Sequence, residues 1–102
     1  MYSLVVTAQA ENDLDDIVAY IVQKLSTPSA ACELLDDIKA CYQKLRKTPY
    51  MYGKCSDIRL QIEGYRRAVI NNYVLVYKIN ESSQTVMIMR YFYGARDYQR
   101  LL

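Results

Sequence analysis

Apolar residues recur along the first half of the chain at intervals of three and four positions, the spacing of one face of an α-helix. One such stripe covers residues 10–25 and a second covers residues 31–45. Residues 2–6 form a short, apolar, β-branched run typical of a strand, and Thr7 follows it as a candidate N-cap. The Ser-Thr-Pro-Ser segment at residues 26–29 suits the hydroxyl cap and proline of a new helix start. Because this link is short, we predict a helical hairpin whose two apolar faces share one surface.

The second half of the chain alternates between apolar and polar positions, as expected of strands. Strands are predicted over residues 58–62, 66–70, 73–79 and 85–93. Turns or loops are predicted at residues 63–64, 71–72, 80–84 and 94–95. Residues 96–102 form either a short helix or a tail. The order β-α-α-β-β-β(-β) predicts the α+β class, with the helical hairpin packed on one face of a mainly antiparallel sheet.

Length and composition fit one domain spanning residues 1–102, with a hydrophobic fraction of 52%. No apolar run approaches the roughly 18 residues of a membrane span, and the first residues lack a basic, apolar secretion signal. We therefore expect a cytoplasmic protein with no membrane partner. The three cysteines, Cys32, Cys41 and Cys55, form no C-x-x-C pair, so we expect buried thiols and no disulfide framework.

The chain has no histidine, which excludes Ser-His and Cys-His catalysis and histidine-based zinc sites. The adjacent pairs Asp15-Asp16 and Asp36-Asp37 lie on predicted helices, where neighbouring residues face different ways. With only three glycines, the chain also has no phosphate-binding glycine loop. We expect no metal and no cofactor, and any catalysis must use Arg, Lys, Tyr, Asp or Glu.

Charge is divided unevenly along the chain. Residues 1–37 hold one basic and seven acidic residues, a balance of −6. Residues 38–102 hold twelve basic and four acidic residues, a balance of +8. Such asymmetry indicates a polyanionic or acidic partner for the basic half. The alternative is an ordinary solvated surface whose two halves compensate each other.

Basic and tyrosine side chains are interleaved in the predicted meander. Its cations include Lys54, Arg59, Arg66, Arg67, Arg90, Arg96 and Arg100. The chain has eleven tyrosines, one phenylalanine and no tryptophan, and tyrosine can both stack and donate a hydrogen bond. This combination suits a nucleic acid, since Arg neutralises phosphate and Tyr stacks on bases, and it suits an acidic peptide equally well.

Strand periodicity assigns these side chains to faces of the sheet. Adjacent Arg66 and Arg67 should point to opposite faces, so that one of them reaches the face that the hairpin leaves open. We expect Arg90 to align with Ile88 and Phe92, and the opposite face to carry Met89, Tyr91 and Tyr93. Tyr73 and Tyr77 alternate with Leu75 as core residues do. Tyr93 and Tyr98 lie where the sheet ends, which leaves either packing or contact with a target open.

Several segments, taken in order and spacing, resemble the RelE/ParE superfamily of toxins over nearly the whole chain. They are Leu14-x-x-Ile17-x-x-Tyr20-Ile21, the break from Pro49 to Gly53, Gly64-Tyr65-Arg66-Arg67, the strand Asn72 to Ile79, and Gly94-Ala95-Arg96-Asp97-Tyr98. The resemblance implies a β-α-α-β-β-β fold and a toxin that inhibits growth of the bacterial cell that makes it. It also implies neutralisation by a cognate antitoxin protein, in a toxin–antitoxin hetero-oligomer, and a role in plasmid stabilisation.

Members of this superfamily act on either of two targets. Some are ribosome-dependent messenger-RNA nucleases, or mRNA interferases, that position the ribose 2′-hydroxyl with clustered Arg and Lys and need no metal; others inhibit DNA gyrase. The nucleases usually carry Arg after the aromatic residue of the Tyr-Arg-Leu-Val-Tyr strand, where this chain has Val74. Tyr93 stands where relatives often have His. The segments around Arg67 and Arg96 are closer to the ParE branch, so we favour gyrase inhibition.

The resemblance also assigns candidate site residues. If the protein is a nuclease, its catalytic candidates are Arg66, Arg67, Tyr93 and Arg96. The candidates for target binding are Lys54, Arg66, Arg67, Arg96 and Tyr98. A third interpretation is a toxin-like binding module that has lost its activity and serves in a repressor complex.

Overall fold

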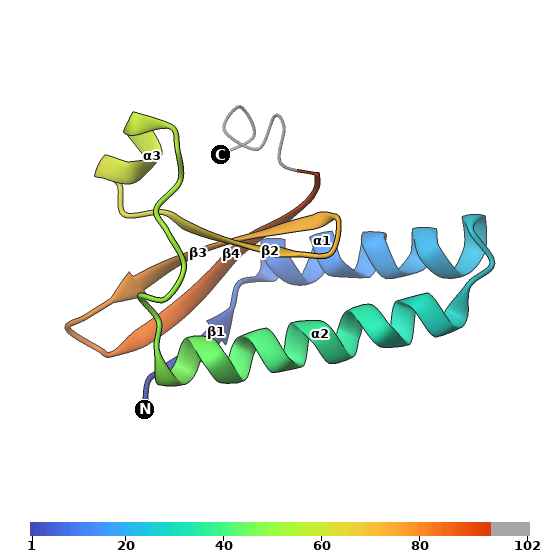
Figure 1. The fold of residues 1–102 in the computed structure, drawn as a ribbon, viewed down its shortest axis with the longest axis horizontal. Helices are drawn as coiled ribbons and strands as arrows, with labels where there is room; N and C mark the ends of the chain where they lie inside the picture. Colours follow the sequence, from blue (N-terminus) through green and yellow to red (C-terminus); the bar gives the residue numbers. More distant parts are fainter. Residues whose placement is uncertain (95–102) are drawn as a thin grey trace.

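A helical hairpin packs on one face of a four-stranded sheet in the computed structural model, which describes residues 1–94 (Figure 1). The elements are β1 (Ser3–Val6), α1 (Ala8–Ala19), the π-helix η1 (Tyr20–Lys24), α2 (Pro28–Lys47), α3 (Ile58–Ile62), β2 (Arg66–Ile70), β3 (Tyr73–Asn80) and β4 (Thr85–Tyr93). The strand order is β1-β4-β3-β2, with β1 parallel to β4 and the other pairs antiparallel. The predicted α+β class and hairpin are confirmed.

The hairpin helices begin where the sequence predicts. The Thr7 hydroxyl accepts a hydrogen bond of 3.2 Å from the amide of Ala10, which caps α1. Pro28 is the first residue of α2, but Thr27 makes no side-chain capping bond, so that part of the prediction is wrong. The backbone carbonyl of Thr27 instead accepts from the amides of Ala30 and Ala31, which starts the helix without its hydroxyl.

The main core lies between the hairpin and the sheet. On α2 it buries a stripe spaced by three and four residues: Ala31, Leu34, Ile38, Cys41 and Leu45. From β3 it takes Leu75 and Tyr77, and Tyr73 is half-buried against it, as the alternation of these residues predicts. The buried Tyr77 hydroxyl donates to the carbonyl of Pro49 at 2.8 Å. This bond joins β3 to the loop after α2 and satisfies a polar group that would otherwise be costly to bury.

Residues 58–62 form the helix α3, so the predicted strand there is wrong. The Asp57 carboxylate accepts from the amide of Leu60 at 3.2 Å and caps the helix. Only Leu60 is buried, while Ile58 and Ile62 are 72% and 81% exposed. The alternation of Ile58, Leu60 and Ile62 therefore does not form one buried face of a strand. In this short helix, only the central residue Leu60 points into the core.

Helix α3 covers part of the sheet face that the hairpin leaves free (Figure 1). A second cluster there consists of Cys55, Leu60, Val74, Val76 and Phe92, with Tyr65 packed against it. The sheet is thus covered on both faces near α3. Cys41 and Cys55 are buried as expected. The expectation is wrong for Cys32, which is exposed because it directly follows Ala31 and so points away from the buried stripe of α2.

A β-bulge changes the phase of β4. Ile88 pairs with Tyr77, and Arg90 pairs with the preceding residue Val76, so Met89 is left without a partner in the ladder. Ile88 consequently faces the hairpin together with Tyr91, which corrects the predicted alignment of Ile88 with Arg90. None of the helices within residues 1–94 is both long and apolar enough to cross a membrane.

Candidate functional site

Arg66 lies on the hairpin side of β2, where it shares a face with the buried residue Ala68. Its Nη1 donates to the carbonyl of Tyr52 at 2.7 Å, and its guanidinium lies 4.9 Å from the centroid of the Tyr50 ring. The loop between α2 and α3 therefore fixes this side chain. A guanidinium held by a carbonyl and an aromatic ring has a defined orientation and offers its remaining donors to a ligand.

Arg67 points to the opposite face of the sheet, as its adjacency to Arg66 predicts. It is half-buried, and its amide donates to the carbonyl of Gly53 at 3.2 Å. The exposed residue Lys54 forms an isolated antiparallel bridge with Arg66. Lys54, Arg66 and Arg67 thus gather where the α2–α3 loop meets β2, and we call these three residues the β2 basic cluster.

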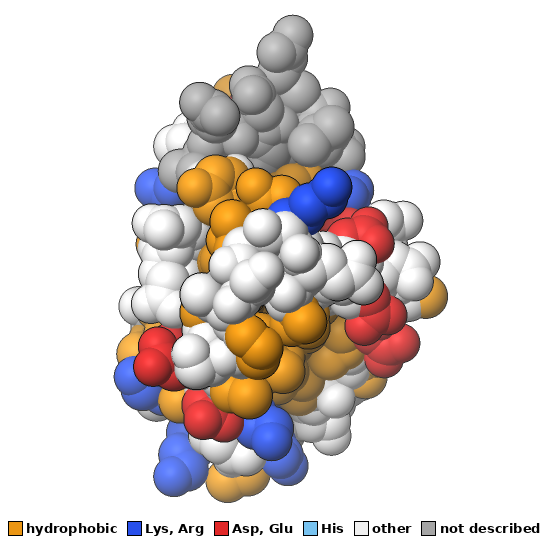
Figure 2. All heavy atoms as spheres, turned by 90° about the vertical axis from the view of Figure 1, so that its right-hand side faces the viewer, with side chains coloured by type: hydrophobic (Ala, Val, Ile, Leu, Met, Phe, Trp, Pro, Cys, Tyr) orange, Lys and Arg blue, Asp and Glu red, His pale blue; other side chains and the backbone are white. Residues whose placement is uncertain are grey.

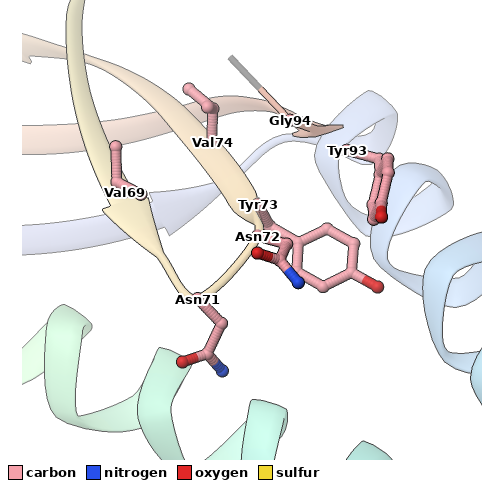
Figure 3. Close-up of a pocket in the computed structure, with 7 residues that line it drawn as sticks. All are labelled: Val69, Asn71, Asn72, Tyr73, Val74, Tyr93 and Gly94. Atoms are coloured by element: carbon pink, nitrogen blue, oxygen red, sulfur yellow. The ribbon is translucent and has the colours of Figure 1, made fainter.

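Tyr93 lies at the other end of the sheet. Its ring packs edge-to-face on Tyr73 with centroids 5.5 Å apart, and Tyr93 remains 66% exposed. Burial raises the pKa of Tyr73, as do the nearby phenols of Tyr93 and Tyr20. A depression of about 520 Å³ surrounds this end of the sheet (Figure 3). It is lined by Val69, Asn71, Asn72, Tyr73, Val74, Tyr93 and Gly94.

The structure does not bring all the candidate residues together. Arg66 pairs with Tyr77, whereas Tyr93 pairs with Tyr73, four positions earlier in the same strand. That offset corresponds to roughly 13 Å along a strand. The predicted site residues Arg96 and Tyr98 lie outside the described residues, as do the cation Arg100 and the predicted terminal element 96–102.

Arg90 has a partner that sequence reasoning missed. Its Nε donates to Asp13 Oδ2 at 2.7 Å, its Nη2 donates to Oδ1 at 3.2 Å, and its guanidinium lies 4.9 Å from the Phe92 ring centroid. The same Asp13 carboxylate accepts from the amide of Tyr91 at 3.0 Å. Asp13 therefore joins α1 to β4 beyond the point where β1 ends. In the sequence, Asp13 is one of several acidic residues near a helix N-terminus, and no local pattern indicates its contact with Arg90.

The tyrosine hydroxyls whose pKa is perturbed are all poor general bases. Burial raises the pKa of Tyr42, Tyr77 and Tyr91, and a hydrogen bond to Glu81 raises that of Tyr2 to about 12. These phenols stay protonated at neutral pH and can donate but not remove a proton. Among residues 1–94, no group of three His, Cys, Asp or Glu side chains is placed to hold a metal ion.

The outer side of the hairpin carries an apolar groove of about 400 Å³. Its apolar lining comes from Leu14, Val18, Val22 and Leu35, and Asp15 and Gln23 add polar groups. Figure 2 views the hairpin end of the molecule and shows hydrophobic side chains gathered between acidic and basic ones. Tyr20 and Leu25, at 55% and 52% exposed, add apolar surface near the hairpin turn. Exposed apolar area of this kind is typical of a surface that binds a partner.

Residues 4–98 match the family described as the ParE toxin of the type II toxin–antitoxin system, parDE. No curated protein matches the chain significantly. Among solved structures, the chain resembles the chromosomal ParDE toxin–antitoxin system from P. aeruginosa, with a TM-score of 0.72 and 21% identity over 92% of this chain and 97% of that chain. It also resembles the toxin–antitoxin complex RelBE2 from Mycobacterium tuberculosis, with a TM-score of 0.61 and 19% identity over 90% and 96% of the two chains. Both likenesses concern the fold.

Proposed function

The chain belongs to the family of ParE toxins of type II toxin–antitoxin systems, and from this premise we propose that it arrests growth by inhibiting DNA gyrase. The observation that supports this target most is Val74, which is 1% exposed inside the second cluster. The nucleases that this chain resembles usually carry an arginine at this position of the strand. A valine packed beneath α3 neither carries a charge nor leaves room for one.

Cleavage of RNA through its 2′-hydroxyl needs cations aimed at the developing phosphorane and a group that removes the proton. The chain has no histidine, and the perturbed tyrosines remain protonated near neutral pH. Arg66 and Tyr93, two of the candidate catalytic residues, lie at opposite ends of the sheet, because Arg66 pairs with Tyr77 and Tyr93 with Tyr73. The described part of the chain is therefore better suited to binding a target than to cutting one.

We propose that the β2 basic cluster contacts the target along the edge strand β2, with Arg66 and Arg67 on either side of that edge, together with Arg96 and Tyr98. Lys54 is exposed, Arg66 is oriented by Tyr50 and Tyr52, and Arg67 is half-buried on the other side of the same strand. A fixed arginine such as Arg66 loses little conformational entropy on binding, and arginines are enriched among residues that dominate interfaces. Such a surface recognises an acidic protein surface or nucleic-acid backbone without any chemical step.

The alternative function is ribosome-dependent cleavage of messenger RNA. The arrangement that favours it is Arg67 together with Lys78, whose Nζ lies 4.3 Å from the Tyr65 ring centroid on the face opposite the hairpin. Cations beside an aromatic ring suit single-stranded RNA.

Sequencing of messenger-RNA 5′ ends after toxin induction separates the two functions. We expect no codon-phased cleavage; phased cuts in ribosome-bound messages would reverse the assignment. An inactive binding module would cause no growth arrest at all.

We further propose that a cognate antitoxin neutralises the toxin by covering its apolar surface. The hairpin groove is lined by Leu14, Val18, Val22 and Leu35, and it can take the apolar face of an amphipathic helix. A domain of 102 residues buries only a modest share of its surface and is marginally stable alone. Burial of the groove by the antitoxin should therefore add appreciably to the free energy of unfolding of the toxin.

Co-expression with the product of the adjoining reading frame should give a complex that melts above the free toxin. At a partner concentration about 100 times Kd, mass action adds about 2.7 kcal/mol to the free energy of unfolding. The measurement is thermal unfolding of the toxin alone and in the purified complex, followed by circular dichroism. Equal melting temperatures for the two samples would remove this partner from the account.

A further inference from the structure

The outer edge of β2 is only partly covered. The amide of Arg67 donates outward to Gly53, and the amide of Cys55 donates to the carbonyl of Tyr65. The segment around Lys54 therefore begins a fifth strand and then leaves the edge. Because outward-facing groups alternate along a strand, the amide and carbonyl of Val69 also point away from β3. Within residues 1–94, no backbone hydrogen bond reaches Val69 from outside the sheet, and Val69 is 60% exposed.

A cleft of about 310 Å³ lies beside this open stretch of edge, between β2 and α2. Its lining residues are Asp37, Ala40, Cys41, Lys44, Tyr52, Val69, Ile70 and Asn71. The Asn71 side-chain amide donates to Asp37 at 3.1 Å and closes one end (Figure 3 shows Asn71 reaching toward the helix below β2). Small side chains on α2, Ala40 and Cys41, leave room along the middle. The cleft thus runs along the part of the edge that has unpaired backbone groups.

We propose that this cleft takes an extended segment of the antitoxin, which adds to the sheet as a fifth strand beside β2 and pairs with Val69. An unpaired edge provides main-chain hydrogen bonds for a peptide, and adjacent pockets select its side chains. The inference rests on the proposed neutralisation by an antitoxin. It concerns a different surface from the hairpin groove, so that one antitoxin chain would contact both.

The charge at the cleft specifies the chemistry of that segment. Lys44 lines the cleft and forms no ion pair with an acidic residue among those described. Asp37, at the other end, is already held by Asn71. An acidic side chain on the added strand would pair with Lys44, while a small apolar neighbour on the same side of the strand would face Ala40 and Cys41. The segment is therefore extended, small and apolar at its centre, and acidic at the position beside Lys44.

The decisive variant is Val69→Pro, because proline removes the outward amide hydrogen. That amide makes no bond to β3, so the ladder between β2 and β3 stays intact, and proline is tolerated at such edge positions. The matched control is Val69→Thr, which keeps both the amide and the β-branched shape. Binding of each purified toxin to the product of the adjoining reading frame is measured by calorimetry. We expect at least about tenfold weaker binding for Val69→Pro, and less than about threefold for Val69→Thr.

Two further measurements do not depend on the folding of the proline variant. Lys44→Glu should weaken binding more than Lys47→Glu, since Lys47 is exposed on the same helix but does not line the cleft. In the unmodified toxin, the Val69 amide should exchange with deuterium more slowly in the complex than in the free protein. The proposal of an added strand would be overturned if a folded Val69→Pro variant bound tightly and the Val69 amide stayed unprotected in the wild-type complex. Neutralisation by the antitoxin would then still stand. A wild-type toxin that binds no such partner would overturn both.

Discussion

Replacement of Asp13 by Ala is expected to lower the free energy of unfolding by about 3 kcal/mol. The carboxylate accepts two bonds from the Arg90 guanidinium, at 2.7 and 3.2 Å, and one from the amide of Tyr91. The side chains of Asp13 and Arg90 are 11% and 24% exposed, so the loss of Asp13 takes two charge-assisted hydrogen bonds from a poorly solvated guanidinium and one from the Tyr91 amide. Removal of one partner from a buried ion pair typically costs about 3–5 kcal/mol, and the residual exposure of Arg90 places the expected value at the lower end.

Urea unfolding followed by circular dichroism measures this effect, with Asp16→Ala as the control. Asp16 lies on the same helix but is exposed, so its removal should change stability by less than about 0.5 kcal/mol. Combining Asp13→Ala with Arg90→Met should recover part of the loss, because the guanidinium that has lost its Asp13 contacts is then removed as well. Equal stability of the two single variants would show that Asp13 does not join α1 to β4.

Replacement of Arg67 by Ala should relieve growth inhibition while leaving the fold intact. The side chain belongs to the proposed target surface, and hot-spot arginines typically contribute about 2 kcal/mol or more, which corresponds to roughly thirtyfold weaker binding. Arg96→Ala should act in the same direction. Lys39→Ala is the matched control, because Lys39 is exposed on α2 away from the β2 basic cluster.

Colony counts after induction report toxicity, and thermal unfolding reports stability. We expect Arg67→Ala to grow while its melting temperature stays near that of the parent protein, and Lys39→Ala to remain toxic. Full toxicity of Arg67→Ala would show that the target is bound elsewhere on the molecule. Loss of toxicity together with a large drop in melting temperature would instead assign Arg67 to stability, since that drop is not expected of a surface residue.

Elements with a strong local signal were predictable from the sequence. The apolar stripe of α2 repeats every three or four residues over five buried positions. The Asn71-Asn72 pair indicates the turn between β2 and β3, where Asn71 adopts the positive φ that asparagine tolerates. The segment 58–62 was not predictable in this way. Its alternation fits a strand, and only the contact of Leu60 with the second cluster and the cap from Asp57 make it a helix.

Long-range contacts account for the rest. The bulge at Met89 follows from how β4 pairs with β3, so periodicity within β4 alone assigned Ile88 to the wrong face. The pairing of Asp13 with Arg90 joins residues 77 positions apart, which no local pattern indicates. For the candidate site, adjacency correctly placed Arg66 and Arg67 on opposite faces, but it could not tell that Tyr93 lies at the far end of the sheet from Arg66.

The most direct test of gyrase inhibition is a supercoiling assay with purified components. Relaxed plasmid, ATP and gyrase from the host in which the toxin arrests growth are incubated with the toxin, with its Arg67→Ala variant, and with the toxin–antitoxin complex. We predict that the toxin blocks supercoiling, that the variant blocks it much less, and that the complex leaves it unaffected. Gyrase as the target would be contradicted if a toxin that arrests growth left supercoiling unimpaired at concentrations above that of the enzyme.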